Sequence, residues 1–332
     1  MIVLITNAIS PYGYDIQQVL GLPNGGNYRF RYRPKWVHSE ISTTYSNPTS
    51  GLIVLRDKST GTLTPIRHIE IFDTGRIGEA IVLHFSIKDY IHPSDAEAII
   101  KSITSWQATN NVENKPGNDL KYLVFKLPED ISPTKVDPDT AWTTVLKSLG
   151  KIQLYDKFGF IRITSLESDG KQAKSTSVGG HQHAFVLAPG KTYTLKAAEY
   201  MPSQITDSDE AIQDPFDVTL HAPSDFSLIR GTQRVVGKYD ELRFVFTVPE
   251  SFAGKTTEIS LSCDQPCDAK KYGISNIALP IKVRRKYRSL IIVVIAFGLY
   301  FLSESIPKSG FTFISPETYR GIATFFIGRY LQ

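Results

Sequence analysis

Arginine and aromatic side chains alternate along residues 27 to 33, in the stretch NYRFRYR. Side chains two positions apart on a β-strand share a face, so one face would carry guanidinium groups and the other aromatic rings. The basic face would consist of Arg29, Arg31 and Arg33, and the aromatic face of Tyr28, Phe30 and Tyr32. A row of guanidinium groups can bind phosphates through paired hydrogen bonds. The stretch therefore predicts a site for a nucleotide or a single-stranded nucleic acid.

Lys35 and Trp36 follow this stretch and would extend the same site. An exposed ring, of Tyr32 or Trp36, can stack on nucleic-acid bases. The structural alternative is an outer strand with solvated arginines and buried Tyr and Phe side chains, and Pro34 favours such a place at the edge of a sheet. If the sheet curls, the surface gains three further cations: Arg67, Arg76 and Lys88.

Two histidines and two cysteines are the candidates for a metal site. His181 and His183 are two positions apart and can share a metal from one strand, whereas Cys263 and Cys267 have no second cysteine pair. A zinc site would need all four side chains, and the alternative is a solvated loop. The motifs of hydrolase nucleophiles, zinc proteases and phosphate-binding loops do not occur. We therefore expect no cofactor, no metal and no enzymatic activity, although catalytic groups can also meet from distant parts of a chain.

Near the end of the sequence, a basic run from Lys282 to Arg288 precedes an apolar stretch without charge, Leu290 to Leu302. This uncharged core is only about 13 residues long, whereas a membrane-spanning helix needs about 20. Extension through residues 287–306 supplies that length, and a basic flank is typical of the cytoplasmic side of a membrane helix. We expect a transmembrane helix over residues 289–306. The alternative is a helix buried in the β-rich body.

A single helix cannot enclose a pore, so conduction would require a homo-oligomer. The residues that would then face the pore are Leu290, Val294, Gly298, Phe301 and Glu304. A ring of Glu304 carboxylates would favour cations at one mouth, while a solvated Glu304 would leave the helix a simple anchor. Residues 315–331 predict an amphipathic helix that lies on the membrane or returns across it.

The rest of the chain predicts a mainly β protein. Residues 1–170 read as a β-rich α+β domain with two short helices, 92–106 and 139–150, and a further short candidate at 14–20. Residues 171–285 contain short strands at regular spacing with no helical pattern, which predicts an antiparallel β-sandwich. Residues 286–332 form the membrane segment.

Net charge, cysteine content and the first residues limit the kinds of partner and the cellular compartment that the sequence predicts. The chain has 332 residues and a formal net charge of +4, so an anionic partner must be recognised by local clusters. Two cysteines do not make a disulfide framework. The first residues, MIVLITNAIS, lack the basic leader of a signal peptide. We therefore expect the β-rich body in the cytoplasm and the C-terminal segment in membrane lipid of the cell inner membrane.

A cytosolic β-rich sensor followed by a small C-terminal membrane segment resembles the membrane effectors of bacterial anti-phage defence, in particular Hailong-type effector channels. The resemblance rests on the domain layout and on the basic-aromatic strand. It implies a partner nucleotidyltransferase that makes a DNA oligomer, which holds an oligomeric channel shut until its loss depolarises the cell. It further implies that Arg29, Arg31 and Arg33 contact the oligonucleotide and that residues 290–306 line or surround the pore.

Three functional hypotheses follow from the sequence. The first is a membrane-anchored effector whose cytosolic domains sense a nucleotide or nucleic acid and gate an oligomeric ion-conducting pore. The second is a non-conducting scaffold that holds a protein partner at the membrane. The third is a membrane-attached enzyme, which a deep pocket with convergent histidines and carboxylates would favour.

Overall fold

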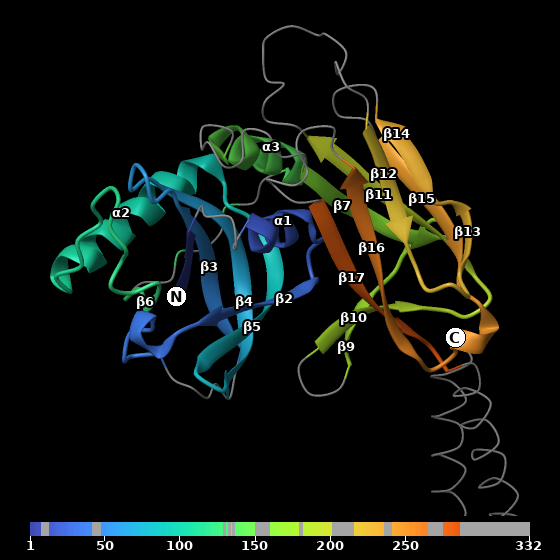
Figure 1. Cartoon of the computed structure of the whole chain (residues 1–332), viewed down its shortest axis with the longest axis horizontal. Helices are drawn as coiled ribbons and strands as arrows, with labels where there is room; N and C mark the ends of the chain where they lie inside the picture. Colours follow the sequence, from blue (N-terminus) through green and yellow to red (C-terminus); the bar gives the residue numbers. More distant parts are fainter. Residues whose placement is uncertain are drawn as a thin grey trace, which may run out of the picture.

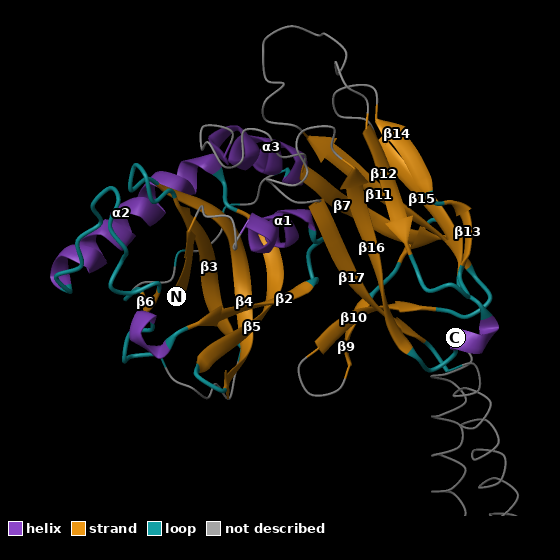
Figure 2. Ribbon diagram, viewed as in Figure 1, coloured by secondary structure: helices purple, strands orange, loops and turns teal. Residues whose placement is uncertain are grey.

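The computed structural model describes residues 1–7, 13–41, 48–128, 131, 134, 137–149, 160–178, 182–200, 216–235, 241–264 and 275–285. A curled sheet lies on one side of the molecule and two further sheets on the other (Figures 1 and 2). The predicted mainly β class is confirmed. The predicted membrane segment, residues 286–332, lies outside the described residues, and none of the helices described is long and apolar enough to cross a membrane.

The first sheet has six strands in the order β2-β5-β4-β3-β1-β6. β1 and β3 are parallel, and all other neighbours are antiparallel. The strands are β1 (Ile2–Asn7), β2 (Asn27–Tyr32), β3 (Thr49–Arg56), β4 (Leu63–Ile77), β5 (Ala80–Tyr90) and β6 (Val124–Lys126). The apolar runs of β1 and β3 are buried on both faces, as expected of parallel strands inside a sheet.

The chain beyond β2 closes this sheet into a barrel. A 3₁₀ turn, Pro34–Trp36, leads to Val37, which forms a parallel bridge to Val124 of β6. The amide of His38 donates to the carbonyl of Val124 at 2.8 Å, and the amide of Leu123 donates to the carbonyl of Trp36 at 2.7 Å. The two edges of the sheet are thereby joined, and we call β1 to β6 with residues 36–38 the barrel.

In the described part of the chain, three α-helices accompany the strands: α1 (Gly13–Gly21), α2 (Pro93–Thr109) and α3 (Pro138–Leu149). The three helices expected within residues 1–170 are thus present. His92 caps α2, its ring accepting from the Ser94 amide, and Pro93 occupies the first helical turn. α3 buries Trp142 and its apolar neighbours, which places the exposed first turn of α3, with Asp139, beside β7.

The remaining strands form two sheets. One has the order β13-β15-β11-β7-β8 and the other β14-β12-β16-β17-β10-β9. Their bounds are β7 (Phe160–Ser168), β8 (Lys171–Gln172), β9 (Ser175–Val178), β10 (Gln182–Leu187), β11 (Thr192–Tyr200), β12 (Phe216–His221), β13 (Ser227–Arg230), β14 (Thr232–Val235), β15 (Glu241–Thr247), β16 (Thr256–Asp264) and β17 (Ser275–Val283). β7 pairs with β11 and so belongs to these sheets, while the domain boundary expected at position 170 stays a prediction.

Alternating burial shows that each of these sheets has one covered face. Along β15, Leu242, Phe244 and Phe246 are buried while Glu241 and Arg243 are exposed. β17 likewise buries every second residue from Ile277 to Val283. We call the two sheets the sandwich. The prediction of a wholly antiparallel arrangement is wrong for one pair, because β10 and β17 run parallel, and mixed sheets of this kind are common.

α1 joins the barrel to the sandwich. Its Gly21 packs so closely that an added Cβ would lie 2.5 Å from the carbonyl oxygen of Ile161 in β7 and 2.1 Å from Cδ1 of Ile277 in β17. The amide of Ala278 donates to Oε1 of Gln18 at 3.3 Å. α1 therefore packs against the part of β17 that precedes its pairing with β10, and it fixes the two halves of the described chain against each other. We call this region the junction.

Candidate functional site

The predicted basic strand exists and lies where the sequence placed it. β2 is an edge strand that pairs only with β5 among the described strands. Arg29 and Arg31 are exposed, whereas Phe30 and Tyr32 are buried, so the predicted alternation is confirmed. Arg33, just beyond the strand, is exposed as well. The edge of the barrel thus presents three guanidinium groups along one extended stretch.

The aromatic side of β2 belongs to the barrel core. The rings of Phe30 and Phe85 meet edge to face with centroids 5.2 Å apart, and the Tyr28 hydroxyl donates to Asp15 of α1 at 2.8 Å. Tyr32 is only 6% exposed, and its hydroxyl donates to the carbonyl of Ile5 at 3.2 Å. Barrel closure thus brings β1 over the Tyr32 ring, so this ring does not have the exposed face that stacking would use, and its part in ligand binding stays a prediction.

Trp36, the other predicted stacking residue, is half-buried and packs against the core. The guanidinium carbon of Arg33 lies 5.8 Å from its ring centroid and the ammonium of Lys35 lies 5.3 Å from it. Cations at this distance from an indole face are attracted by its electron density. The ring is thus flanked by two exposed positive charges, a setting that favours an anionic ligand with a flat apolar part.

A pocket of about 230 Å³ opens at this end of the barrel, between β1 and the 3₁₀ turn. Three residues predicted from the sequence, Arg31, Tyr32 and Trp36, line it. Further lining residues were missed by the sequence interpretation, among them Thr6, Asn7, Asp15, Lys58, Asp119 and Leu123. The Oδ1 atom of Asn7 is buried and has no hydrogen-bond partner among the described residues. We call the pocket with Arg29, Arg33 and Lys35 the barrel mouth.

Positive charge prevails over the two carboxylates at the barrel mouth. The ammonium of Lys58 lies 2.8 Å from the Asp119 carboxylate, and this hydrogen bond lowers the pKa of Asp119, with further lowering by Arg56 and Lys35. Burial raises the pKa of Asp15, an effect opposed by its hydrogen bond from Tyr28 and by the charge of Arg31. The surroundings thus favour the ionised form of Asp119 and disfavour the ionised form of Asp15. The arrangement can bind an oxyanion at Arg31 while a ring lies against Trp36.

The further cations expected on this surface have other roles. Arg67 is fully buried and donates to the carbonyls of Val19, Leu22 and Lys88, so the prediction that it joins the basic surface is wrong. Lys88 pairs with Glu70 at 2.6 Å. The side chain of Arg76 is exposed, and its Nε donates to the carbonyl of Gly78 at 3.3 Å.

Comparison with known proteins does not identify the function of this site. No protein-family model and no curated protein matches the chain. Among solved structures, it is similar to the crystal structure of a protein of unknown function from Porphyromonas gingivalis W83, with 11% identity and a TM-score of 0.24. That alignment covers 39% of this chain and 49% of the other, so this chain spans about half the length of that protein.

The remaining predicted sites lie outside the described residues. Those in the membrane segment are Leu290, Val294, Gly298, Phe301 and Glu304. His181 and Cys267 are also outside, as are the side chains of His183 and Cys263, so the zinc hypothesis stays a prediction. Within the part of the chain that the structure describes, no group of three or more His, Cys, Asp or Glu side chains could hold a metal ion.

Proposed function

We propose that this chain is a membrane-anchored effector whose barrel mouth binds a nucleotide or a single-stranded nucleic-acid oligomer and thereby controls an oligomeric ion-conducting pore. The C-terminal segment after Arg285 would form the anchor and the pore in the cell inner membrane, with the barrel and the sandwich in the cytoplasm. The proposal agrees with the resemblance to anti-phage effector channels in domain layout, including a partner nucleotidyltransferase as the source of the oligomer.

The observation that carries the sensor half is the meeting of Arg31 and Trp36 at one pocket. A guanidinium group that can bind a phosphate and an indole ring that can stack on a base are the two components of single-strand binding. Arg33 and Lys35 add charge directly over the same ring. Mixed basic and aromatic lining of this kind fits a nucleotide better than it fits a peptide or a sugar.

The row of arginines along β2 favours an oligomer over a single nucleotide. Alternate residues of a strand are about 7 Å apart on one face, so Arg29, Arg31 and Arg33 present guanidinium groups at regular intervals. An extended nucleic-acid strand could place successive phosphates beside them. Because such contacts release counterions, the affinity would fall steeply with added salt.

Basic residues at one end of the sandwich support the membrane half of the proposal. From this end the chain leads to the C-terminal segment. β17 ends at Val283, and Arg284 follows. Arg284 lines a hollow of about 350 Å³ that also contains Lys171, Lys174 and Lys191. Asp169, which pairs with Lys191 at 3.0 Å, is the carboxylate in this lining. Lysines and arginines next to a membrane segment are attracted to anionic lipid headgroups on the cytoplasmic side.

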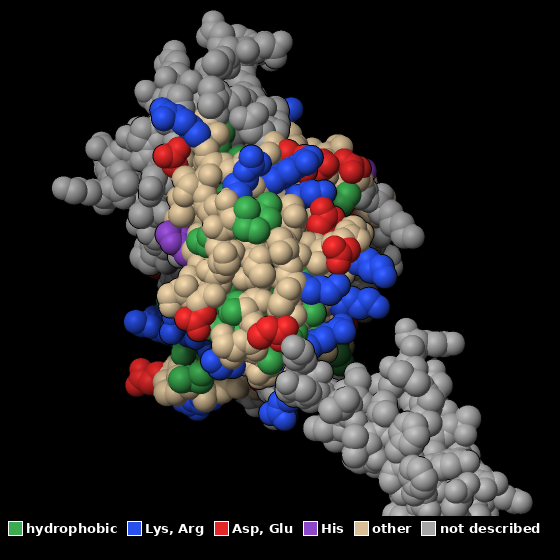
Figure 3. All heavy atoms as spheres, turned by 90° about the vertical axis from the view of Figure 1, so that its right-hand side faces the viewer, with side chains coloured by type: hydrophobic (Ala, Val, Ile, Leu, Met, Phe, Trp, Pro, Cys, Tyr) green, Lys and Arg blue, Asp and Glu red, His purple; other side chains and the backbone are tan. Residues whose placement is uncertain are grey.

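The sensor half is tested by the binding of fluorescently labelled single-stranded DNA at several salt concentrations. We expect Arg29→Glu/Arg31→Glu to lower the affinity at least tenfold and to flatten the salt dependence. The matched control is Arg230→Glu/Arg234→Glu, which changes two exposed arginines of β13 and β14. These control positions lie in the sandwich, where positive and negative side chains are mixed on the face shown in Figure 3. Equal binding by wild type and Arg29→Glu/Arg31→Glu would remove β2 from the site.

The pore half is tested by ion flux in liposomes that contain the full chain. We expect flux that changes when the bound DNA oligomer is removed, and a reduced flux for Gly298→Leu, which adds bulk to the predicted pore wall. Absence of flux under every ligand condition would overturn the pore. A protein that is monomeric in detergent and still binds the membrane would instead support the scaffold.

A further inference from the structure

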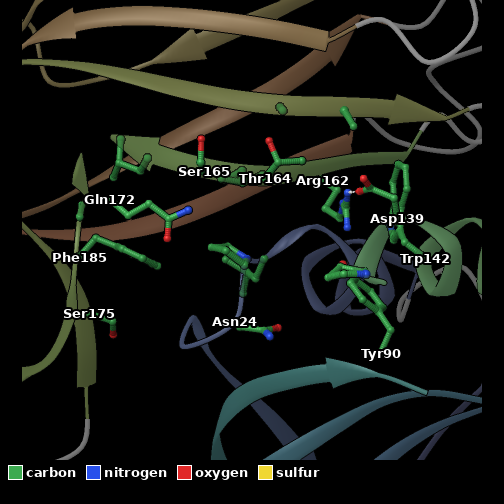
Figure 4. A pocket seen from close by; sticks show the side chains of 18 of the residues that line it. Asn24, Tyr90, Asp139, Trp142, Arg162, Thr164, Ser165, Gln172, Ser175 and Phe185 are labelled. Carbon is green, nitrogen blue, oxygen red and sulfur yellow. Dashed lines mark hydrogen bonds and ion pairs between the residues drawn. The ribbon is translucent and has the colours of Figure 1, made fainter. Parts of the chain in front are cut away.

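The largest pocket among those described lies at the junction, away from the barrel mouth. Its volume is about 770 Å³, within the range of small-molecule sites. Residues of the barrel, of α3 and of the sandwich all line it, including Asn24, Tyr90, Trp142, Arg162 and Phe185 (Figure 4). A molecule bound here would touch both halves of the described chain.

Arg162 of β7 is the unusual group in this pocket. Its side chain is only 7% exposed, and one Nη donates to the carboxylate of Asp139, which is 76% exposed. The Nε atom is buried and has no hydrogen-bond partner within the described part of the chain. The guanidinium lies 5.0 Å from the ring centroid of Trp142 and 6.0 Å from that of Tyr90. A buried cation with an unused donor is costly unless an acceptor reaches it.

Arg67, on the other side of Tyr90, shows what a purely structural arginine looks like here. Its guanidinium lies 3.9 Å from the Tyr90 ring centroid and donates to three backbone carbonyls and to Oδ1 of Asn24. Every nitrogen of this group is thus engaged. Arg162 lies near the same ring, but its Nε has no acceptor among the described residues. Arg67 therefore contributes only charge to the pocket, whereas Arg162 also contributes a hydrogen-bond donor.

The strand that carries Arg162 is irregular next to the pocket. The register of β7 against β11 shifts between Lys196 and Ala197, so that Thr164 is left out of the ladder between the paired residues Ile163 and Ser165. Bulges of this kind redirect side chains and occur next to binding sites. The hydroxyl oxygen of Ser165 is buried without a hydrogen-bond partner among the described residues, and it gives the pocket a second unused polar atom.

We propose that the junction pocket binds a small organic anion, a phosphate monoester or a carboxylate, whose oxygens accept hydrogen bonds from Arg162. The apolar part of the ligand lies against Trp142 and Tyr90, whose rings line the same pocket beside the guanidinium. In the absence of ligand, the Asp139 carboxylate pairs with the guanidinium of Arg162. It therefore competes with the ligand for this group. Because the walls come from the barrel and the sandwich, an occupied pocket holds the two halves together and couples them. This inference does not depend on oligonucleotide binding at the barrel mouth.

The test is isothermal titration calorimetry of the full chain in detergent with two probes, phenyl phosphate and benzoate, which separate phosphate from carboxylate recognition. We expect at least one probe to bind. Arg162→Gln should lower its affinity at least about tenfold, the range for hydrogen bonds to charged groups. Asp139→Asn, a change at an exposed side chain, should raise the affinity a few fold because it removes the competing anion.

Arg230→Glu is the matched control, because it changes an exposed arginine of β13 that does not line the junction pocket, and it should leave this binding unchanged. If Arg162→Gln does not fold, the opposite sign expected for Asp139→Asn still decides. Three results would overturn the proposal: no binding of either probe by the wild type, equal binding by Arg162→Gln, or binding that is weakened by Arg230→Glu and unaffected by Asp139→Asn.

Discussion

The barrel mouth and the junction both use arginines, but they hold them in different environments. At the mouth, Arg29 and Arg31 extend into solvent from an edge strand. At the junction, Arg67 and Arg162 are buried against the two faces of the barrel–sandwich contact. An exposed arginine adds charge that salt can screen, whereas a buried arginine must have its donors satisfied. Mutation of Arg29 or Arg31 should therefore affect binding, whereas mutation of the fully engaged Arg67 should affect folding.

The largest effect should come from Arg67→Met. This change leaves three backbone carbonyls and Oδ1 of Asn24 without their buried donors, and we expect a loss of about 4 kcal/mol in the free energy of unfolding. Urea denaturation measures it. Arg76→Met, at an exposed position of the same strand, is the control and should change stability by less than about 0.5 kcal/mol. Similar losses for the two variants would contradict the contrast between buried and exposed arginines.

Gly21→Ala should have the next largest effect. A Cβ at this position would lie within 2.5 Å of the Ile161 carbonyl oxygen, and backbone cannot yield as a side-chain end does. We expect a loss of about 2–3 kcal/mol and faster cleavage between the barrel and the sandwich in limited proteolysis. Gly75→Ala, where an added Cβ meets no atom within 4 Å, is the control. Unchanged proteolysis would mean that α1 does not fix the junction.

Trp36→Ala separates stacking from charge at the barrel mouth. Loss of a stacked base costs about 1–3 kcal/mol of binding free energy, and we expect this loss at every salt concentration. Arg29→Gln should instead reduce the slope of log affinity against log salt by roughly one unit. Fluorescence anisotropy with labelled single-stranded DNA measures both. A changed salt slope in Trp36→Ala, with no change in Arg29→Gln, would reverse the roles assigned here.

The smallest effect concerns the two carboxylates of the mouth. Burial raises the pKa of Asp15 above its ordinary value of 3.8, so the folded state binds its proton more readily, and stability falls as pH rises through that window. Asp15→Asn should therefore raise the melting temperature at pH 7 by about 1–2 °C, with no gain below pH 4. Asp119, whose pKa Lys58 lowers, contributes stability above 3.8 that is lost as pH falls. Asp119→Asn should lower the melting temperature slightly in differential scanning fluorimetry at pH 7.

Local patterns in the sequence were sufficient for the elements and for part of the mouth. The two-residue period of residues 28–32 gives the exposed arginines and the buried aromatics, because side-chain direction along a strand is local. The hydrogen bond from the Tyr32 hydroxyl to the Ile5 carbonyl could not be predicted in this way, because Ile5 belongs to a distant strand. Lys58 and Asp119 reach the mouth from separate connections, and only barrel closure brings them together.

The junction was not predicted from the sequence. Arg162 stands between Ile161 and Ile163, and Arg67 follows Ile66. Neighbouring side chains on a strand point to opposite faces, so a similar local pattern describes these buried arginines and the exposed Arg29 and Arg31. The sequence alone does not show which rings and carbonyls receive such side chains, because these come from α1, α3 and β5.

Barrel closure has a consequence for biosynthesis. The bridge from Val37 to Val124 joins the start of the barrel sequence to its end, so the pocket at the mouth is among the contacts of longest range in this half of the chain. Long-range pairings form late, and a nascent chain emerges from the ribosome N-terminus first. Arg29 and Arg31 are thus translated early, but their pocket is complete only after β6 has left the ribosome. An unfinished chain could carry the charges that attract a nucleic acid without the cavity that would select one.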